Sequence, residues 1–168
     1  YYLKEGETMH LAVQRESKAA RQSAGILDAS TLGKIDIQGT DASEFLNRVY
    51  TNAWSKLAIG KCRYGLMLNE DGMVYDDGVT TRLDENHYIM TTTTGGAATV
   101  LGKLEDYLQT EWPELDVYLT SVTDHYATVS VCGPNSKKIV SQVIPDLDFS
   151  DENFPHMSFK NAKIGSIK

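Results

Sequence analysis

The spacing of hydrophobic and polar positions changes along the chain, and these changes predict short strands that alternate with helices. Strands are expected where β-branched and aromatic residues cluster or alternate with polar ones, at 26–28, 34–38, 87–92, 117–122 and 127–132, with a hairpin over 62–81. Helices are expected where apolar residues recur every three or four positions, at 7–24, 41–50, 95–112 and from Gly133-Pro134 onward. Residues 145–161 contain two prolines and predict a loop.

The order of these elements indicates the fold class. A β-α-β-β-(β)-α-β succession followed by β-α is typical of ferredoxin-like subdomains in the α+β class. We expect an N-terminal extension with a helix at 1–24, a first subdomain at 25–112 and the start of a second at 113–168. The chain starts on Tyr1 without an initiator Met, and 163–167 resembles the beginning of a strand, so we expect a truncated piece of a longer polypeptide.

Two helix starts carry polar signals of their own. Asp41 and Glu44 have the spacing of a capping box, in which side chains bond free N–H groups of the first turn. Gly95-Gly96 opens the third helix after a run of threonines, and a tight turn is the favoured interpretation. The alternative is an anion site made by free N–H groups and the helix dipole, although the Lys and the spacing of a phosphate-binding loop are missing.

Composition narrows the possible functions. The net charge of −7, with no dense Lys/Arg cluster, argues against nucleic-acid binding, which needs a basic surface. No apolar run reaches the roughly 20 residues that span a bilayer. Cys62 and Cys132 lie in apolar strand-like runs, so two buried free thiols in a reducing cytoplasm are expected. None of the four histidines has metal-ligand spacing, so no metal site is expected.

The hairpin contains the most unusual polar pair of the chain, Asp76 and Asp77. Aspartate fits strands poorly, and successive strand residues point to opposite faces of a sheet. One of the two carboxylates must therefore enter the packed side, where it needs partners, and such a conflict with local preference often marks a functional site. The plain alternative is that one faces water while the other caps the turn or pairs with Arg63 or Arg82.

The sequence around this pair resembles a known family. Residues 64–80 (YGLMLNEDGMVYDDGVT) are similar to the folate-binding aminomethyltransferases, which include the glycine cleavage T-protein: a Tyr, a turn of the type Asn-x-x-Gly, then Asp-Asp before apolar residues. Residues 28–39 (DASTLGKIDIQG) and 63–72 (RYGLMLNEDG) resemble a branch of this family, the C-terminal half of sarcosine oxidase alpha subunits. The resemblance runs through nearly the whole chain.

The resemblance implies a folate site. The positions that match folate-contacting residues of the family are Leu32, Tyr64, Val79 and Thr93. Asp77 is the expected catalytic carboxylate, with Asp76 as second choice. The chain departs from the family at Thr93, where relatives commonly carry Asn, and at Thr31, where many carry His. A second family signature, with the Glu that holds the pterin, is expected shortly after Lys168, so the fragment alone is expected to bind folate weakly or not at all and to be inactive.

The resemblance also implies a reaction. In such sarcosine oxidases a flavin on a partner subunit oxidises sarcosine to an iminium, and the one-carbon unit passes to tetrahydrofolate, giving 5,10-methylenetetrahydrofolate and glycine. Tetrahydrofolate is therefore the expected cofactor, with FAD, FMN and NAD elsewhere in the parent complex, and the other sarcosine oxidase subunits are the expected partners. One alternative is a T-protein-type aminomethyltransferase or a dimethylglycine-oxidising relative. Another, of a different class, is a non-catalytic subunit-interface module.

Overall fold

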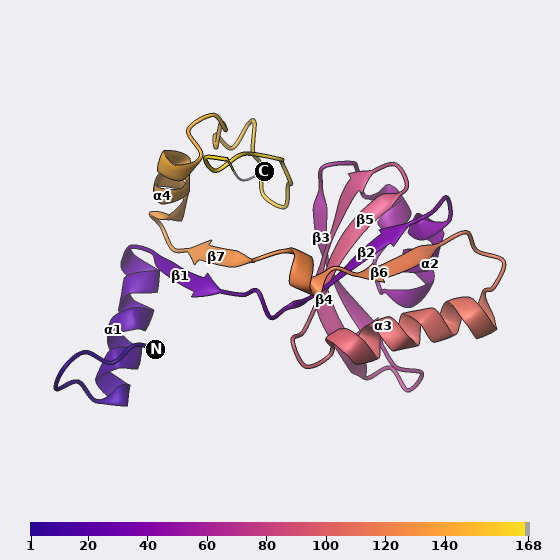
Figure 1. Ribbon diagram of the computed structural model, residues 1–168, viewed down its shortest axis with the longest axis horizontal. Helices are drawn as coiled ribbons and strands as arrows, with labels where there is room; N and C mark the ends of the chain where they lie inside the picture. Colours follow the sequence, from indigo (N-terminus) through magenta and orange to yellow (C-terminus); the bar gives the residue numbers. More distant parts are fainter. Residues whose placement is uncertain (167–168) are drawn as a thin grey trace. The chain divides into compact units, whose positions relative to one another are not determined.

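A five-stranded antiparallel sheet with the strand order β3-β4-β5-β2-β6 organises the larger part of the chain (Figure 1). Its strands are β2 (Gly33–Gln38), β3 (Cys62–Leu68), β4 (Val74–Asp84), β5 (His87–Thr92) and β6 (Tyr118–Ser121). The helices in this part are α2 (Ala42–Val49), η1 (Trp54–Lys56), α3 (Ala97–Asp106), the π turn η2 (Tyr107–Glu111) and η3 (Thr123–His125). The order is that of a ferredoxin-like unit with β3 as an added edge strand, which confirms the predicted α+β class.

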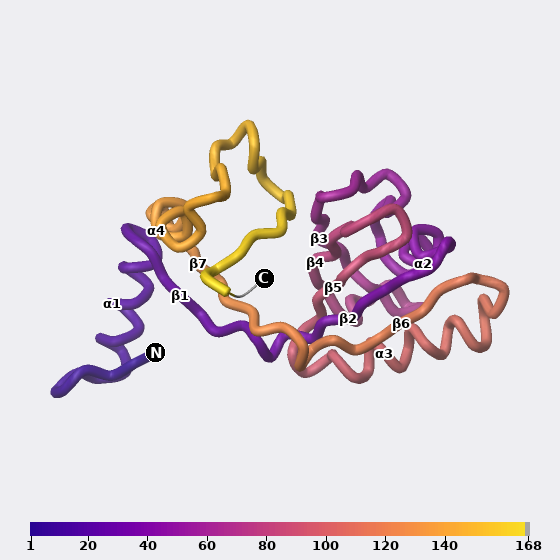
Figure 2. Tube along the Cα trace, turned by 45° about the horizontal axis from the view of Figure 1, so that its top comes forward, coloured from indigo at the N-terminus to yellow at the C-terminus, as the bar shows by residue number. Residues whose placement is uncertain are grey.

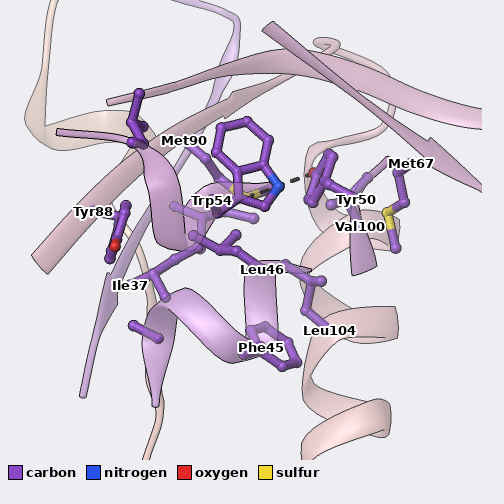
Figure 3. Close-up of a cluster of buried hydrophobic side chains, with 13 residues drawn as sticks. Ile37, Phe45, Leu46, Tyr50, Trp54, Met67, Tyr88, Met90, Val100 and Leu104 are labelled. Carbon is purple, nitrogen blue, oxygen red and sulfur yellow. Dashed lines mark hydrogen bonds between the residues drawn. The ribbon is translucent and has the colours of Figure 1, made fainter. Parts of the chain in front are cut away.

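One face of this sheet carries the hydrophobic core. Side chains of β2, β3 and β5 meet α2, η1 and α3 in a single buried cluster, part of which Figure 3 shows. The cluster comprises Ile35, Ile37, Ala42, Phe45, Leu46, Tyr50, Trp54, Leu57, Met67, Tyr88, Met90, Val100 and Leu104. Gly65 allows β3 to approach η1, because a Cβ there would lie 2.6 Å from the Trp54 ring. Both α2 and α3 cover this face. The opposite face, which we call the open face, carries neither of them, and η3 approaches it at Lys34, near the start of β2.

A second compact unit contains the remaining secondary structure of the described residues, 1–166. In it β1 (Gly25–Asp28) pairs antiparallel with β7 (Val129–Cys132), as Figure 2 shows, and α1 (Met9–Gln22) and α4 (Ser136–Val143) accompany them. Thr8 caps α1 by accepting a hydrogen bond from the N–H of Leu11. The unit comprises residues 1–29, 128–154 and 161–166, whereas residues 30–127 and 155–160 form the unit with the large sheet.

The two units divide the chain differently from the predicted borders at 24 and 112. Strand pairing gives the reason: β6 lies beyond residue 112 yet pairs with β2, and β1 lies within 25–112 yet pairs with β7. Pairing between strands that are distant in sequence cannot be obtained from the order of elements alone. The expected strand at 163–167 is represented by a bridge at Ile164, and Ile167 lies outside the described residues.

Two local predictions were wrong. Asp41 does not cap α2 with its side chain; its carboxylate accepts a hydrogen bond from the backbone N–H of Asp116 at 2.9 Å, so no capping box forms. The cysteines are free but not buried, because Cys62 is half-buried and Cys132 is exposed on β7. Within residues 1–166 we find no helix with the length and apolar character needed to cross a membrane.

Candidate functional site

The hairpin of β3 and β4 directs the two adjacent aspartates to opposite faces of the large sheet. Asp76 pairs across the strands with Met67, which belongs to the core, whereas Asp77 pairs with Leu66. Cross-strand partners share a face, so Asp76 faces the helices and Asp77 faces the open side. The prediction that one carboxylate of the pair enters the packed side is confirmed, and that carboxylate belongs to Asp76, which is 4% exposed.

The buried carboxylate of Asp76 holds the turn that leads from β5 into α3. It accepts a hydrogen bond from Thr93 Oγ1 at 2.6 Å, and the Thr93 backbone N–H lies 3.3 and 3.4 Å from its two oxygens. Gly96 leaves room for it, because a Cβ at that position would lie 2.9 Å from Asp76 Oδ1. A carboxylate at the start of a helix also interacts favourably with the helix dipole. The Gly-rich start of α3 therefore already has an anion, which supports the tight-turn interpretation over a phosphate site.

On the open face, Asp77 forms a pair with Tyr64. The Tyr64 hydroxyl donates a hydrogen bond of 2.7 Å to Asp77 Oδ2. This bond, together with partial desolvation and the charges of Asp77 and Asp76, raises the pKa of the Tyr64 hydroxyl. Tyr64 is 50% exposed, so the aromatic ring remains accessible to a ligand. Val79 is the direct cross-strand partner of Tyr64, so its side chain lies on the same face.

Tyr50 belongs to the core on the packed side of the hairpin, and the charges of the two aspartates affect the pKa of its hydroxyl. Its hydroxyl contacts the Met90 sulfur at 3.6 Å. Burial, with added effects of Asp76 and Asp77, raises the pKa of Tyr50 far above its usual value. The Tyr50 hydroxyl is therefore a neutral group of the core and not an acid or base of the site.

The face that bears Tyr64 and Asp77 continues from the hairpin across β5 to β2, where it ends at the buried Lys34. Thr91 Oγ1 accepts a hydrogen bond from the Val79 backbone N–H at 2.9 Å, and Thr91 pairs across the strands with Lys34. A row of side chains thus crosses four strands, formed by Tyr64, Val79, Thr91 and Lys34. Asp77 lies beside this row on β4. Leu32 lies at the β2 end of this row, directly before the strand, and its carbonyl accepts a hydrogen bond from Lys34 Nζ at 3.0 Å.

The structure brings some of the predicted site residues together and separates others. Tyr64, Asp77 and Val79 lie together on the open face. Asp76 and Thr93 lie together on the packed side. The alternative in which an aspartate pairs with an arginine is wrong: Arg63 donates to the carbonyl of Ala53, and Arg82 donates to the carbonyls of Leu57 and Glu85.

Sequence reasoning missed two residues of this face, Thr91 and Lys34. Thr91 is one of four consecutive threonines. Its hydroxyl accepts the hydrogen bond of the Val79 backbone N–H, in place of a backbone carbonyl. Lys34 is a polar neighbour of Ile35 in the predicted strand at 34–38, yet it is 3% exposed. Nothing in the alternation of polar and apolar residues signals its burial. Among the described residues no group of three or more His, Cys, Asp and Glu side chains could hold a metal ion.

Comparison with known proteins identifies the family. The sequence model of the GCVT N-terminal domain matches residues 1–168. The chain belongs to this family. Its fold agrees with a crystal structure of glycine cleavage system aminomethyltransferase T from Bartonella henselae, with a TM-score of 0.71 and 25% identity over 78% of this chain and 35% of that chain.

Curated proteins similar to this chain include sarcosine oxidase alpha subunits and aminomethyltransferases. The alpha subunits of sarcosine oxidase from Corynebacterium sp. (strain P-1) and Rhizobium meliloti (strain 1021) are 56% and 49% identical over 99% and 98% of this chain. An aminomethyltransferase from Listeria monocytogenes serotype 4a is 32% identical over 84% of this chain and 38% of its own length. The chain spans 17% of the length of the two sarcosine oxidase subunits.

Proposed function

We propose that this chain forms one wall of the folate site of a sarcosine-oxidase-type enzyme and transfers a one-carbon unit to tetrahydrofolate. The observation that carries the proposal is the hydrogen-bonded pair of Tyr64 and Asp77 on the open face, beside Val79. The predicted folate-contacting and catalytic positions Tyr64, Val79 and Asp77 meet there. The identity of 56% to a sarcosine oxidase alpha subunit favours this branch over the aminomethyltransferases, which are less similar.

The open face has the chemistry that a folate ring needs. Small-molecule sites combine apolar and aromatic side chains with a few well-placed polar groups. Here an accessible Tyr64 ring and Val79 supply the apolar surface, and the Asp77 carboxylate supplies the polar group. Leu32 lies at the other end of the row and would limit the site on the β2 side. The residues present therefore fit the ring of a folate.

Tyr64 and Asp77 have separate tasks in this proposal. The Tyr64 hydroxyl occupies one lobe of Asp77 Oδ2 and fixes the orientation of the carboxylate. The remaining lone pairs of Asp77 can accept a proton from an amine on the open face, which is general base catalysis by a positioned carboxylate. A carboxylate at this place also stabilises a cationic carbon that approaches the amine. Bound tetrahydrofolate would supply that amine as the acceptor of the one-carbon unit.

Asp76 supports the site from the other side of the sheet. Its carboxylate is engaged by both donors of Thr93 and is buried, so it is not available to a ligand on the open face. Asp76 therefore holds β4 against the β5–α3 turn, while Asp77 serves as the general base. We place Thr93 with Asp76 in this supporting role and not among the residues that contact folate.

The wider setting of the chain follows from its relatives. Because it spans 17% of a sarcosine oxidase alpha subunit, the chain would act as part of a longer subunit. In that setting the oxidation of sarcosine would take place elsewhere, with flavin and NAD bound outside this chain. Other sarcosine oxidase subunits would then be its partners, and the isolated chain would be inactive.

The adjacent aspartates provide a matched pair of variants for the test. Asp77→Asn and Asp76→Asn are compared in the complete enzyme, with sarcosine oxidation measured without folate and one-carbon transfer measured with tetrahydrofolate. Asp77→Asn should lower transfer by about 10²-fold or more, the range for loss of a proton-transfer group. It should leave sarcosine oxidation without folate unchanged. Asp76→Asn should lower transfer far less.

Two outcomes would contradict the proposal. Near-wild-type transfer in both variants would remove the catalytic role of Asp77 and leave the open face as a non-catalytic subunit interface. Absence of tetrahydrofolate binding to the complete enzyme would remove the folate site altogether. Glycine-dependent transfer without sarcosine oxidation would instead favour the aminomethyltransferase alternative.

A further inference from the structure

Lys34, the second residue of β2, has a buried side-chain ammonium. The residue is 3% exposed. Its Nζ donates to three backbone carbonyls, those of Ser30 at 2.9 Å, Leu32 at 3.0 Å and Thr123 at 3.4 Å. Lysine is almost never fully buried in proteins. A buried charge is costly unless hydrogen bonds compensate it, so three converging carbonyls explain how the ammonium is tolerated.

The ammonium joins two segments that are far apart in sequence. Residues 30–32, which we name the β2 lead segment, provide two of the three carbonyls, and η3 provides the third. The backbone strengthens the same connection, because the Lys34 N–H donates to Thr123 Oγ1 at 3.0 Å and the Val122 N–H donates to the Lys34 carbonyl at 2.9 Å. Lys34 therefore determines where the β2 lead segment runs.

The β2 lead segment borders the open face of the sheet. Lys34 pairs with Thr91, and the Thr91 hydroxyl contacts the backbone of Val79. Because neighbouring strands lie about 4.8 Å apart, the row from Tyr64 through Val79 and Thr91 to Lys34 extends over about 14 Å. Leu32 lies at the far end of that row. The position of its backbone is set directly by the hydrogen bond from Lys34 Nζ.

A second contact connects the β2 lead segment to the turn that Asp76 holds. Thr31 Oγ1 lies 3.2 Å from Thr94 Oγ1, and Thr94 follows Thr93 in the β5–α3 turn. The carboxylate of Asp76 and the ammonium of Lys34 thus stabilise two neighbouring backbone segments at the same end of the sheet. Both charges are buried, and both are satisfied by groups of the chain itself.

We propose that Lys34 is a positioning residue of the folate site: its ammonium fixes the β2 lead segment, and through it Leu32, as the wall opposite Tyr64. This inference rests on the proposed function and names the residue that shapes one side of its site. Lys34 does not touch the ligand or the reacting atoms. It acts through the backbone of the β2 lead segment, so its loss should weaken folate binding and leave flavin-dependent chemistry elsewhere in the enzyme intact.

Lys34→Met in the complete enzyme tests the inference, with Lys103→Met as the matched control. Lys103 is half-buried, and its Nζ donates to Asn69 Oδ1 at 3.0 Å and lies 4.4 Å from the centre of the Tyr75 ring. Both variants remove an ammonium that the fold uses, so both should lower the melting temperature. Only Lys34→Met should raise the Kd for tetrahydrofolate, measured by calorimetry, by about tenfold. Sarcosine oxidation without folate should keep its kcat in both variants.

Chemical rescue separates a positioning role from general destabilisation. Lys34→Ala leaves a space beside three carbonyls that a small alkylammonium ion can enter. Ethylammonium should therefore lower the Kd of Lys34→Ala for tetrahydrofolate towards the wild-type value and should not change the Kd of Lys103→Ala. This arm also decides the question if Lys34→Met does not fold.

The outcomes distinguish this inference from the proposed function. If the wild-type enzyme binds tetrahydrofolate and Lys34→Met binds it equally well, the inference is overturned while the folate site stands. A Kd of Lys34→Ala that is raised but does not respond to ethylammonium also overturns it. If the wild-type enzyme binds no tetrahydrofolate, the proposed function fails and the inference fails with it.

Discussion

Replacing Asp76 by Ala should destabilise the unit with the large sheet, because its buried carboxylate is the acceptor for both donors of Thr93. A hydrogen bond to a charged group contributes about 1.5–3 kcal/mol net. The bond from Thr93 Oγ1 is short, at 2.6 Å, whereas the backbone N–H lies at 3.3 and 3.4 Å and contributes less. We therefore expect the free energy of unfolding to fall by about 2–3 kcal/mol.

Tryptophan fluorescence during urea unfolding is the assay for this unit. The chain has two tryptophans, Trp54 and Trp112, and both belong to the unit formed by residues 30–127 and 155–160. Their signal therefore reports on this unit alone. With an m-value of about 1–3 kcal/mol per M, the midpoint of Asp76→Ala should fall by about 0.7–3 M urea.

Asp77→Ala is the control, since it removes the neighbouring carboxylate from the open face. The Asp77 carboxylate accepts a hydrogen bond from the hydroxyl of Tyr64, and this accessible hydroxyl can turn to water in the variant, so the midpoint should move by a small fraction of the Asp76→Ala shift. A double-mutant cycle of Asp76→Ala with Thr93→Val should give a coupling energy of at least about 1 kcal/mol. Equal midpoints for the two aspartate variants, or additive effects in the cycle, would refute the role given to Asp76.

Two further predictions concern protonation. Asp77→Asn should lower the pKa of Tyr64 towards its ordinary value, because the hydrogen bond that the protonated hydroxyl donates to Asp77 is the main cause of the raised pKa. Nuclear magnetic resonance of ¹³Cζ-labelled tyrosine, assigned with Tyr64→Phe, measures this pKa. An unchanged pKa would contradict the pairing of Tyr64 with Asp77. Arg15, with the N–H of Lys4, lowers the pKa of Glu7 from 4.5 to about 2, so the contacts of Glu7 should persist above pH 4.5 and be lost as the pH falls towards 2. The amide resonance of Lys4 should then titrate with a midpoint near 2, and a midpoint near 4.5 would show that Glu7 is unpaired.

The sequence alone was sufficient for most of the helices and strands and for one pair of residues that conflicts with its surroundings, Asp76 and Asp77. Hydrophobic spacing and turn residues are local signals, and they located β5 at 87–92, the β3–β4 hairpin and its turn at 69–72, and the start of α3 after Gly96. The adjacent aspartates also follow from a local rule, since strand residues alternate between faces. Their spacing therefore predicted one buried carboxylate before any partner was known.

Only the tertiary structure decided which aspartate enters the core. The register of the hairpin places Asp76 opposite Met67, and a shift by one residue would have exchanged the two faces. Register depends on the packing of the whole sheet against α2 and α3, which the sequence of a single strand does not contain. The same reason separates Asp77 from Thr93, although both were predicted for one site.

Partners that are distant in sequence also required the fold. The carbonyls that hold Lys34 come from Ser30, Leu32 and Thr123, and the third is 89 positions away from the lysine. Backbone carbonyls have no residue-specific signature, so no pattern in the chain could identify this lysine as a buried cation. The sequence by itself determined most of the helices and strands and the conflict at the two adjacent aspartates. The pairing of distant strands then decided how each conflict is resolved, because burial and hydrogen bonding depend on neighbours in space.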